Sequence, residues 1–111
     1  MSENCIFCKI ANGQIPSEFV YESDNVVVFN DINPQAPTHL LVVPRVHVES
    51  LKELKDTALM SELLIAVQEA TKKLDISDYR TVINTGKGVG QEVFHLHIHV
   101  MAGREFSWPA G

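Results

Sequence analysis

Histidine and apolar residues alternate along positions 95–100, near the end of the chain. Successive side chains of a β-strand point to opposite faces, so this period of two predicts a strand over residues 93–100. One face is expected to pack on the core and consists of Phe94, Leu96, Ile98 and Val100. The other face consists of Val93, His95, His97 and His99. A solvated face is usually filled with Lys, Glu, Thr or Ser, so three histidines in register indicate a face that carries chemistry.

A long amphipathic helix is predicted between residues 56 and 74, where apolar residues recur at steps of three and four. Asp56 is its expected N-cap. The apolar positions are Leu59, Met60, Leu63, Leu64, Val67, Ala70 and Leu74. A short helix is predicted over residues 5–12, with Gly13 as its stop signal.

Segments rich in β-branched and aromatic residues predict further strands. Ser23 and Asp24 are expected to form the turn of a hairpin between the first two, and a glycine-rich turn joins the last to the histidine strand. These strands are expected at residues 17–22, 25–31, 39–44 and 79–86, with a proline-containing loop at 32–38. The pattern predicts an α+β domain, in which an antiparallel sheet of about five strands carries one long helix and one short N-terminal helix.

Composition narrows the class of protein. With 111 residues the chain fits one domain, residues 1–111, and its hydrophobic fraction of 45% is ordinary for a soluble globular protein. No apolar run approaches the roughly 18–20 residues of a membrane span, and the N-terminus lacks the pattern of a secretory signal, so a cytoplasmic location is expected. The formal charge of −5 disfavours binding to nucleic acids or anionic membranes, although a small phosphorylated ligand needs only a local site.

Cys5 and Cys8 are separated by two residues. A structural disulfide is disfavoured in a reducing cytosol, which leaves a redox pair or half of a metal site.

The histidine row suggests two kinds of chemistry. His95 and His97 could ligate a metal, as alternating strand histidines do, but the only acidic residue nearby is Glu92. A neutral imidazole could instead attack phosphorus and later leave from it. Such a nucleophile needs its other ring N–H held by a carbonyl or another acceptor, donors for the phosphoryl oxygens and a proton source for the leaving group.

Several residues could supply these groups. The turn at residues 86–91 contains three glycines, whose backbone can approach an anion with its N–H groups exposed. Asn84 and Gln91 flank the turn as side-chain donors. Asp31 enters the proline-containing loop and could accept hydrogen bonds from a ribose or cap the loop.

Five motifs together resemble the histidine triad proteins, and in particular their bacterial phosphoramidase-like branch. The motifs are "CIFCKI", "DINPQAPTHLLVVPRVH", "VINTGKGVGQEVFHLHIHV", the overlapping triad "HLHIHVM" and the terminal "WPAG". The resemblance covers nearly the whole chain, with these motifs in the same order.

The resemblance implies a homodimer that binds purine nucleoside monophosphates and hydrolyses a bond between phosphorus and nitrogen, as in adenosine 5′-phosphoramidate or an adenylated lysine. It implies that His97 is the nucleophile and forms a nucleotidyl-imidazole intermediate. His99 is expected to bind the phosphate and assist proton transfer to the leaving amine. His39 resembles the histidine that orients the imidazole of the nucleophile.

The resemblance also implies a nucleotide site. Asn84 and the amides around Gly90 and Glu92 resemble the groups that hold the phosphate, Asp31 resembles the acid that binds the ribose, and apolar residues form walls around the base. The expected set is Ile6, Phe7, Phe29, Asp31, Ile32, Leu41, Asn84, Gly90, Gln91, Glu92, Val93, His97, His99 and Trp108.

Two features depart from many relatives. Glu92 occupies a position that is often Ser, and a carboxylate 4 Å from a phosphate would repel it by about 1–4 kcal/mol. Glu92 therefore points away or favours a cationic leaving group such as a lysine amine. The cysteine pair resembles half of a structural zinc site that His47 and His95 complete in some bacterial members, a closed shell of two thiolates and two imidazoles. Free, partly buried thiols are the alternative, and catalysis would need no metal.

Three other functions remain open from the sequence. The dinucleoside polyphosphate hydrolases of the same family share the triad, although the tail favours the phosphoramidase branch, in which Trp108 would reach the site of the partner subunit. A regulatory module that binds nucleotides is the second alternative. A protein that only binds metal is disfavoured, because it would leave the glycine turn, His39 and Asp31 without roles.

Overall fold

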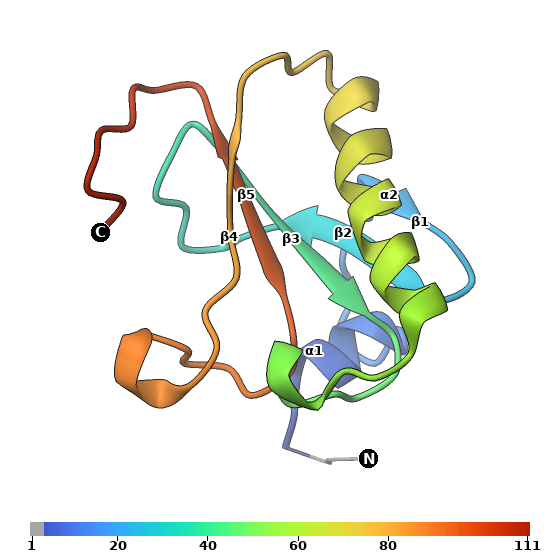
Figure 1. Cartoon of the computed structure of the whole chain (residues 1–111). Helices are drawn as coiled ribbons and strands as arrows, with labels where there is room; N and C mark the ends of the chain where they lie inside the picture. The colour runs from blue at the N-terminus through green and yellow to red at the C-terminus, as the bar shows by residue number, and fades with distance from the viewer. Residues whose placement is uncertain (1–3) are drawn as a thin grey trace.

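The apolar segments of the chain form a single antiparallel sheet in the computed structural model, which describes residues 4–111 (Figure 1). The strand order is β1-β2-β3-β5-β4, and every neighbouring pair is antiparallel. The strands are β1 (Tyr21–Glu22), β2 (Val26–Asn30), β3 (Thr38–Pro44), β4 (Arg80–Val82) and β5 (Ile98–Ala102). The helices are α1 (Ile6–Ala11) and α2 (Thr57–Lys73), with two short 3-10 turns, η1 (Leu51–Glu53) and η2 (Lys87–Val89). The predicted α+β class, with one long and one short helix, is confirmed.

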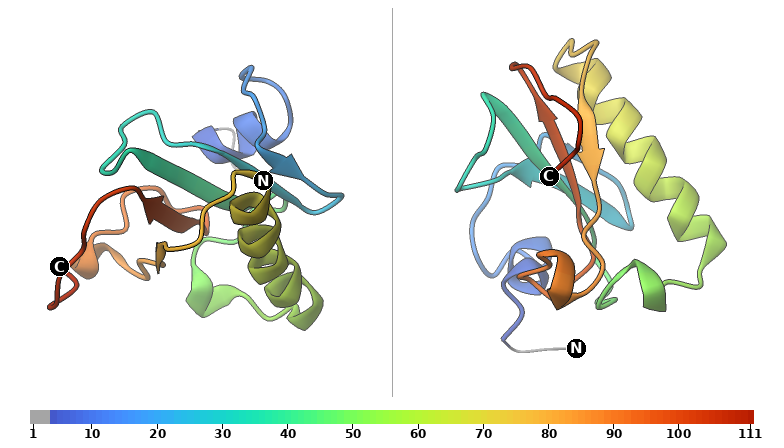
Figure 2. Two further views of the ribbon diagram at one scale, coloured as in Figure 1. Left: turned by 90° about the horizontal axis from the view of Figure 1, so that it is seen from above. Right: turned by 60° about the vertical axis from the view of Figure 1, so that its left-hand side comes forward.

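The two helices cover opposite faces of the sheet (Figure 2). β2 and β3 are buried on both faces, because their alternate residues pack against different helices. The residues on the α2 side include Val26, Val28, Leu40 and Val42. Those on the α1 side are Val27, Phe29, Leu41 and Val43. Two apolar layers therefore meet at the sheet, which explains the unbroken apolar runs of these strands.

The long helix begins where the sequence predicts. The Asp56 side chain caps α2 by accepting a hydrogen bond from the backbone N–H of Leu59, at 3.1 Å. The buried stripe contains Leu59, Leu63, Ala66, Val67 and Ala70. Three members of the predicted stripe lie outside it, since Met60, Leu64 and Leu74 are exposed. The buried stripe is thus narrower than the apolar periodicity alone indicated.

The histidine strand is shorter than predicted and begins later. β5 starts at Ile98, because the backbone N–H of Leu96 donates to the carbonyl of Val48, outside the regular sheet, at 2.7 Å. Phe94 was expected in the core and is instead 46% exposed. The rest of that face is confirmed, since Leu96, Ile98 and Val100 lie in the core on the α2 side.

The predicted hairpins are present with shorter strands. β1 pairs with β2, and β4 pairs with β5 in antiparallel register. The segment between β2 and β3 is a loop, as expected. Within residues 4–111, none of the helices has the length and apolar character needed to cross a membrane.

Candidate functional site

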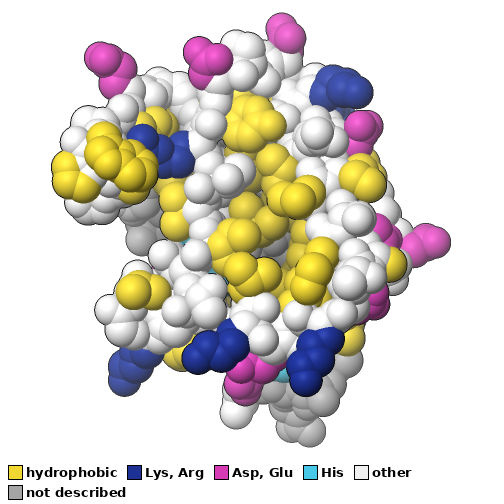
Figure 3. All heavy atoms as spheres, in the orientation of Figure 1, with side chains coloured by type: hydrophobic (Ala, Val, Ile, Leu, Met, Phe, Trp, Pro, Cys, Tyr) yellow, Lys and Arg dark blue, Asp and Glu magenta, His cyan; other side chains and the backbone are white. Residues whose placement is uncertain are grey.

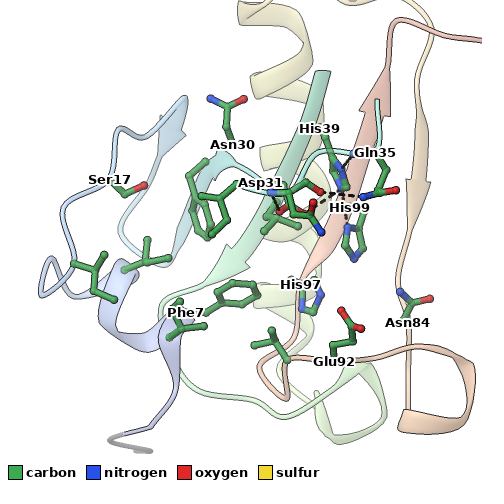
Figure 4. A pocket seen from close by; sticks show the side chains of 18 of the residues that line it. Phe7, Ser17, Asn30, Asp31, Gln35, His39, Asn84, Glu92, His97 and His99 are labelled. Carbon is green, nitrogen blue, oxygen red and sulfur yellow. Dashed lines mark hydrogen bonds and ion pairs between the residues drawn. The ribbon is translucent and has the colours of Figure 1, made fainter. Parts of the chain in front are cut away.

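A cavity of about 690 Å³ lies on the α1 side of the sheet, within the size range of small-molecule sites (Figure 4). Its apolar part is formed by α1, the segment after it and the end of β2, and its polar part by the histidines and the loops around them. The structure gathers thirteen of the predicted site residues in its lining: Ile6, Phe7, Phe29, Asp31, Ile32, His39, Leu41, Asn84, Gly90, Glu92, Val93, His97 and His99.

The sheet register explains how the histidines meet. In the pairing of β3 with β5, Leu41 is opposite His99 and His39 is opposite Met101. His39 and His99 are therefore diagonal neighbours on one face of two adjacent strands, where side chains reach each other.

His97 is held in one tautomer by the backbone. Its Nδ1 lies 2.8 Å from the carbonyl oxygen of His95. A carbonyl can only accept, so Nδ1 carries the proton and Nε2 keeps its lone pair. The imidazole is 7% exposed, and the ring of Phe7 contacts it edge-on with centroids 5.1 Å apart. The hydrogen bond at Nδ1 thus leaves Nε2 as the nitrogen of His97 that can act as a nucleophile.

His39 and His99 form a second ordered pair. The backbone N–H of Gln35 donates to Nδ1 of His39 at 2.9 Å, so the proton of His39 is on Nε2. That nitrogen lies 2.9 Å from Nδ1 of His99 and 3.4 Å from a carboxylate oxygen of Asp31. Because His39 donates to Nδ1 of His99, the proton of His99 is on its Nε2.

Burial keeps both of these imidazoles neutral. It lowers the pKa of His99 to about 4, an effect that the neighbouring His97 and His39 reinforce. Burial also lowers the pKa of His39, against an opposing influence of the Asp31 carboxylate. One proton on each ring agrees with the tautomers that the hydrogen bonds define.

The structure corrects the expected role of His39. The prediction was that His39 orients the imidazole of His97, but its hydrogen bond is to His99. The carbonyl of His95 orients His97 instead. The reason is the register, which places the His39 ring beside His99 (Figure 4).

Two other predicted residues lie outside the cavity. Gln91 is buried, and its amide accepts from the backbone N–H of Gly86 at 2.8 Å and donates to the carbonyls of Glu49 and Val93. The side chain of Gln91 therefore closes the glycine turn, and a contact of this residue with a nucleotide stays a prediction. Trp108 is 83% exposed and away from the cavity of its own chain.

The glycine turn has the backbone conformation that only glycine adopts readily. Gly86 and Gly90 have φ values of 102° and 104°, in the region that is strained for other residues. Gly90 lines the cavity. Asp31 both lines the cavity and caps its own loop, since one of its oxygens accepts from the N–H of Asn33 at 2.9 Å.

Sequence reasoning missed seven lining residues: Ile10, Ile15, Pro16, Ser17, Asn30, Asn33 and Gln35. Asn30 and Asn33 flank Asp31, so proximity to a predicted site residue was an available signal. Gln35 donates a hydrogen bond to His39 through its backbone N–H, and the residue type at position 35 does not predict such a contact.

A cluster of four ligand-type side chains lies behind His97. Cys5, Cys8, His47 and His95 place their ligand atoms within 4.8 Å of one another, and neither cysteine is in a disulfide. Nδ1 of His95 is 3.2 Å from Sγ of Cys5 and 3.4 Å from Sγ of Cys8. Nδ1 of His47 is 3.3 Å from Sγ of Cys8. The structure therefore brings together the four residues of the predicted zinc site.

The cluster fits a tetrahedral zinc ion. Zn–S and Zn–N bonds of ordinary length imply S···N edges of about 3.5 Å, close to the observed separations. Nε2 of His95 lies 2.8 Å from the carbonyl of Pro44, so Nε2 holds the proton and Nδ1 offers its lone pair to the cluster. Burial lowers the pKa of His95 to about 4, despite the opposing hydrogen bond to Pro44, which keeps the ring neutral as a ligand must be.

The comparisons with known proteins agree with this geometry. Residues 4–107 match the family described as "Scavenger mRNA decapping enzyme C-term binding". Protein HitA of Neisseria gonorrhoeae is 51% identical over 102 residues, which cover 89% of this chain and 95% of that protein. A HIT family hydrolase from Legionella pneumophila Philadelphia 1 superposes with a TM-score of 0.91 at 43% identity, covering 97% of this chain and 100% of that one. A histidine triad protein from Clostridium difficile gives the same TM-score and identity over 96% of each chain.

The fold and the histidine cluster thus define a domain of the histidine triad type. The chain belongs to the histidine triad (HIT) family of nucleotide-binding proteins, and His95, His97 and His99 form its triad.

Proposed function

We propose that this chain hydrolyses the phosphorus–nitrogen bond of purine nucleoside 5′-phosphoramidates through a nucleotidyl intermediate on His97. One observation carries the proposal: the His95 carbonyl leaves the Nε2 lone pair of His97 free, in the same cavity as the Nε2–H of His99. The Legionella pneumophila relative is described as a hydrolase, which supports the class of reaction.

The reaction balances over two displacements. Nε2 of His97 attacks phosphorus, and the P–N bond to the leaving group breaks as the bond to the imidazole forms. The leaving amine departs with a proton from Nε2 of His99, whose ring has first taken up a second proton from the solvent, so that His99 returns to its neutral form. Water then attacks the phosphorus of the intermediate and returns a proton to His99, while His97 recovers its lone pair. The products are a nucleoside monophosphate and an amine.

Neutral donors would hold the phosphate. The cavity lining within residues 4–111 contains no Lys or Arg, so the phosphoryl oxygens depend on N–H groups. Candidates are the amide of Asn84, the backbone around Gly90 and the ring N–H of His99. The base would lie between apolar side chains such as Phe7 and Phe29, and Asp31 would bind the ribose with the oxygen that the loop does not use.

Glu92 would act on the leaving group. Its side chain lies between His97 and Asn84 in Figure 4, with the carboxylate directed into the cavity rather than away from it. A carboxylate there disfavours an anionic leaving group and favours a cationic amine. Glu92→Ser should therefore lower the preference for a phosphoramidate of a cationic amine over one of a neutral amine. An unchanged preference would contradict this role.

Two further features complete the proposal. The Cys5, Cys8, His47 and His95 cluster holds a structural Zn²⁺ ion, which when bound joins α1 to the segment before β5 and takes no part in the chemistry. The chain works as a homodimer, in which Trp108 reaches the nucleotide site of the partner subunit. Hydrophobic side chains gather on the face shown in Figure 3, over the region between β4 and α2, and such an exposed apolar patch is typical of a dimer interface. A cytoplasmic location stays a prediction.

The decisive experiment is to trap the intermediate. Rapid quenching of turnover with adenosine 5′-phosphoramidate, followed by peptide mass spectrometry, should find the adenylyl group on His97. His97→Asn should reduce turnover by at least about a thousandfold while AMP still binds. An adduct on another residue, or near-normal turnover by His97→Asn, would contradict the proposal. Diadenosine polyphosphates in the same assay distinguish the dinucleoside polyphosphate hydrolase branch.

A further inference from the structure

The metal ligands and the cavity residues alternate along the same two short segments. Cys5 and Cys8 enclose Ile6 and Phe7, which line the cavity. His95 belongs to the Cys/His cluster, and His97, two residues later, lines the cavity. Each segment therefore contributes to both sites.

Phe7 connects the two sites by direct contact. Its ring centroid is 6.0 Å from that of His95 and 5.1 Å from that of His97, in edge-on geometry in both cases. It also contacts Phe29 on β2, with centroids 5.8 Å apart. A change in the position of Phe7 would therefore alter the cavity wall and the packing around the imidazole of His97.

The position of Phe7 depends on what holds α1. This helix has only six residues, too few to be stable by itself, so contacts with the rest of the chain must fix it. The thiol groups of Cys5 and Cys8 are among its buried contacts, and they face His47 and His95 from other parts of the chain. A metal ion at the cluster would join these segments covalently.

His95 provides a second connection. Its ring faces the cysteines through Nδ1, while its backbone carbonyl accepts the hydrogen bond that fixes the tautomer of His97. A ligand bond to the ring would restrain the backbone of the same residue, and with it the acceptor for His97.

We infer that metal bound by Cys5, Cys8, His47 and His95 raises the affinity of the cavity for a nucleotide that it does not touch. The inference rests on the proposed function, since it assumes that the cavity is the nucleotide site. Linkage is reciprocal, so a bound nucleotide raises the affinity for the metal by the same factor.

The test measures binding rather than turnover. AMP is titrated by calorimetry into the full-length protein loaded with Zn²⁺ and into the same protein after removal of metal by a chelator. We expect the dissociation constant for AMP to rise about tenfold without metal. The affinity for Zn²⁺, measured by competition with a chelating dye, should rise by an equal factor when AMP is present. This second measurement starts from folded, metal-loaded protein and determines the same coupling from the opposite side of the thermodynamic cycle.

Three variants sharpen the test. His47→Asn removes a ligand that lies outside the cavity, and in zinc-containing buffer it should bind AMP as weakly as the metal-free protein. Phe7→Leu keeps every ligand and should reduce the ratio between the loaded and stripped affinities. Ile32→Ala is the matched control, because Ile32 lines the cavity from the loop between β2 and β3, away from the ligand-bearing segments. It should weaken both affinities and leave their ratio unchanged.

The outcomes separate the two proposals. If loaded protein does not bind AMP, both the proposed function and the inference are wrong. If AMP binds with equal affinity with and without metal, only the inference is overturned. If no metal binds, the proposed structural zinc is wrong as well, while the proposed hydrolysis by His97 stands. A ratio that Phe7→Leu reduces and Ile32→Ala does not would establish Phe7 as the connecting residue.

Discussion

Two clusters of ligand-type side chains lie on the same side of the sheet, and only one of them suits a metal ion. The first is Cys5, Cys8, His47 and His95, and the second is Asp31, His39 and His99. In each cluster the ligand atoms lie within 4.8 Å of one another. Residue type and distance do not separate them, since two histidines and a carboxylate are also a common metal site.

The backbone partners of the imidazoles separate the clusters. The Nε2–H of His95 donates a hydrogen bond to the Pro44 carbonyl, so the nitrogen facing the cysteines can bind a metal. His39 accepts the Gln35 N–H at Nδ1, so the nitrogen facing His99 and Asp31 carries the proton and cannot be a ligand. A carbonyl oxygen beside one ring thus leaves a nitrogen free for a metal ion in the first cluster, and an N–H beside the other ring places a proton between the side chains of the second.

Removal of a cysteine should have the largest effect on stability. Cys8→Ser is expected to abolish the metal content of purified protein and to lower the free energy of unfolding by about 3–5 kcal/mol. The reason is the loss of the Cys8 thiolate, which lies beside both His47 and His95 in the cluster. Elemental analysis and urea unfolding measure the two effects. Asp31→Asn, in the second cluster, should keep one metal per chain; loss of metal from that variant would contradict the comparison.

Removal of His99, the proposed proton donor, should lower turnover without changing the metal content. His99→Asn is expected to lower turnover by at least about a hundredfold, since Asn cannot deliver a proton. Its metal content should equal that of the wild-type chain. Loss of metal from this variant, or normal turnover by it, would contradict the assignment of metal binding to the first cluster and proton transfer to the second.

A smaller effect is expected from the residue that orients His99. His39→Asn removes the N–H that Nδ1 of His99 accepts, so the His99 proton is no longer fixed on Nε2. We expect turnover to fall by about tenfold, with unchanged metal content. The nitrogen chemical shifts of the His99 ring, measured by NMR, should show a mixture of tautomers. A single unchanged tautomer would refute the assignment.

The smallest effect is on the pH dependence of stability. The pKa of His99 is lowered to about 4 in the folded chain and is about 6.5 when unfolded. Between these values the unfolded chain binds more protons, so the free energy of unfolding falls as the pH drops from 6.5 to 4. Because the ring is partly exposed, solvent screening limits its contribution to about 1 kcal/mol. Chemical unfolding at several pH values should give a shallower decline for His99→Asn, and parallel curves would exclude this contribution.

Local patterns predicted much of the fold. The capping of α2 by Asp56, the loop between β2 and β3, and the core positions of Leu96, Ile98 and Val100 all follow from spacing and residue type. The prediction that Phe94 is buried was wrong because its segment lies outside the sheet. Periodicity carries no information about where strand pairing begins. The exposure of Leu64 depends on how much of the surface of α2 the sheet covers, which is a property of the folded chain.

The sequence by itself determined which chemical groups are present and which side of a strand each occupies, because residue type and the period of two are local properties. Strand register decided which histidines meet, so that His39 contacts His99 rather than His97. The carbonyls of His95 and Pro44 and the N–H of Gln35 decided which nitrogen of each imidazole holds the proton. Every residue has a backbone carbonyl and every residue except proline has an N–H, so only the tertiary structure shows which of these groups lies beside a given ring.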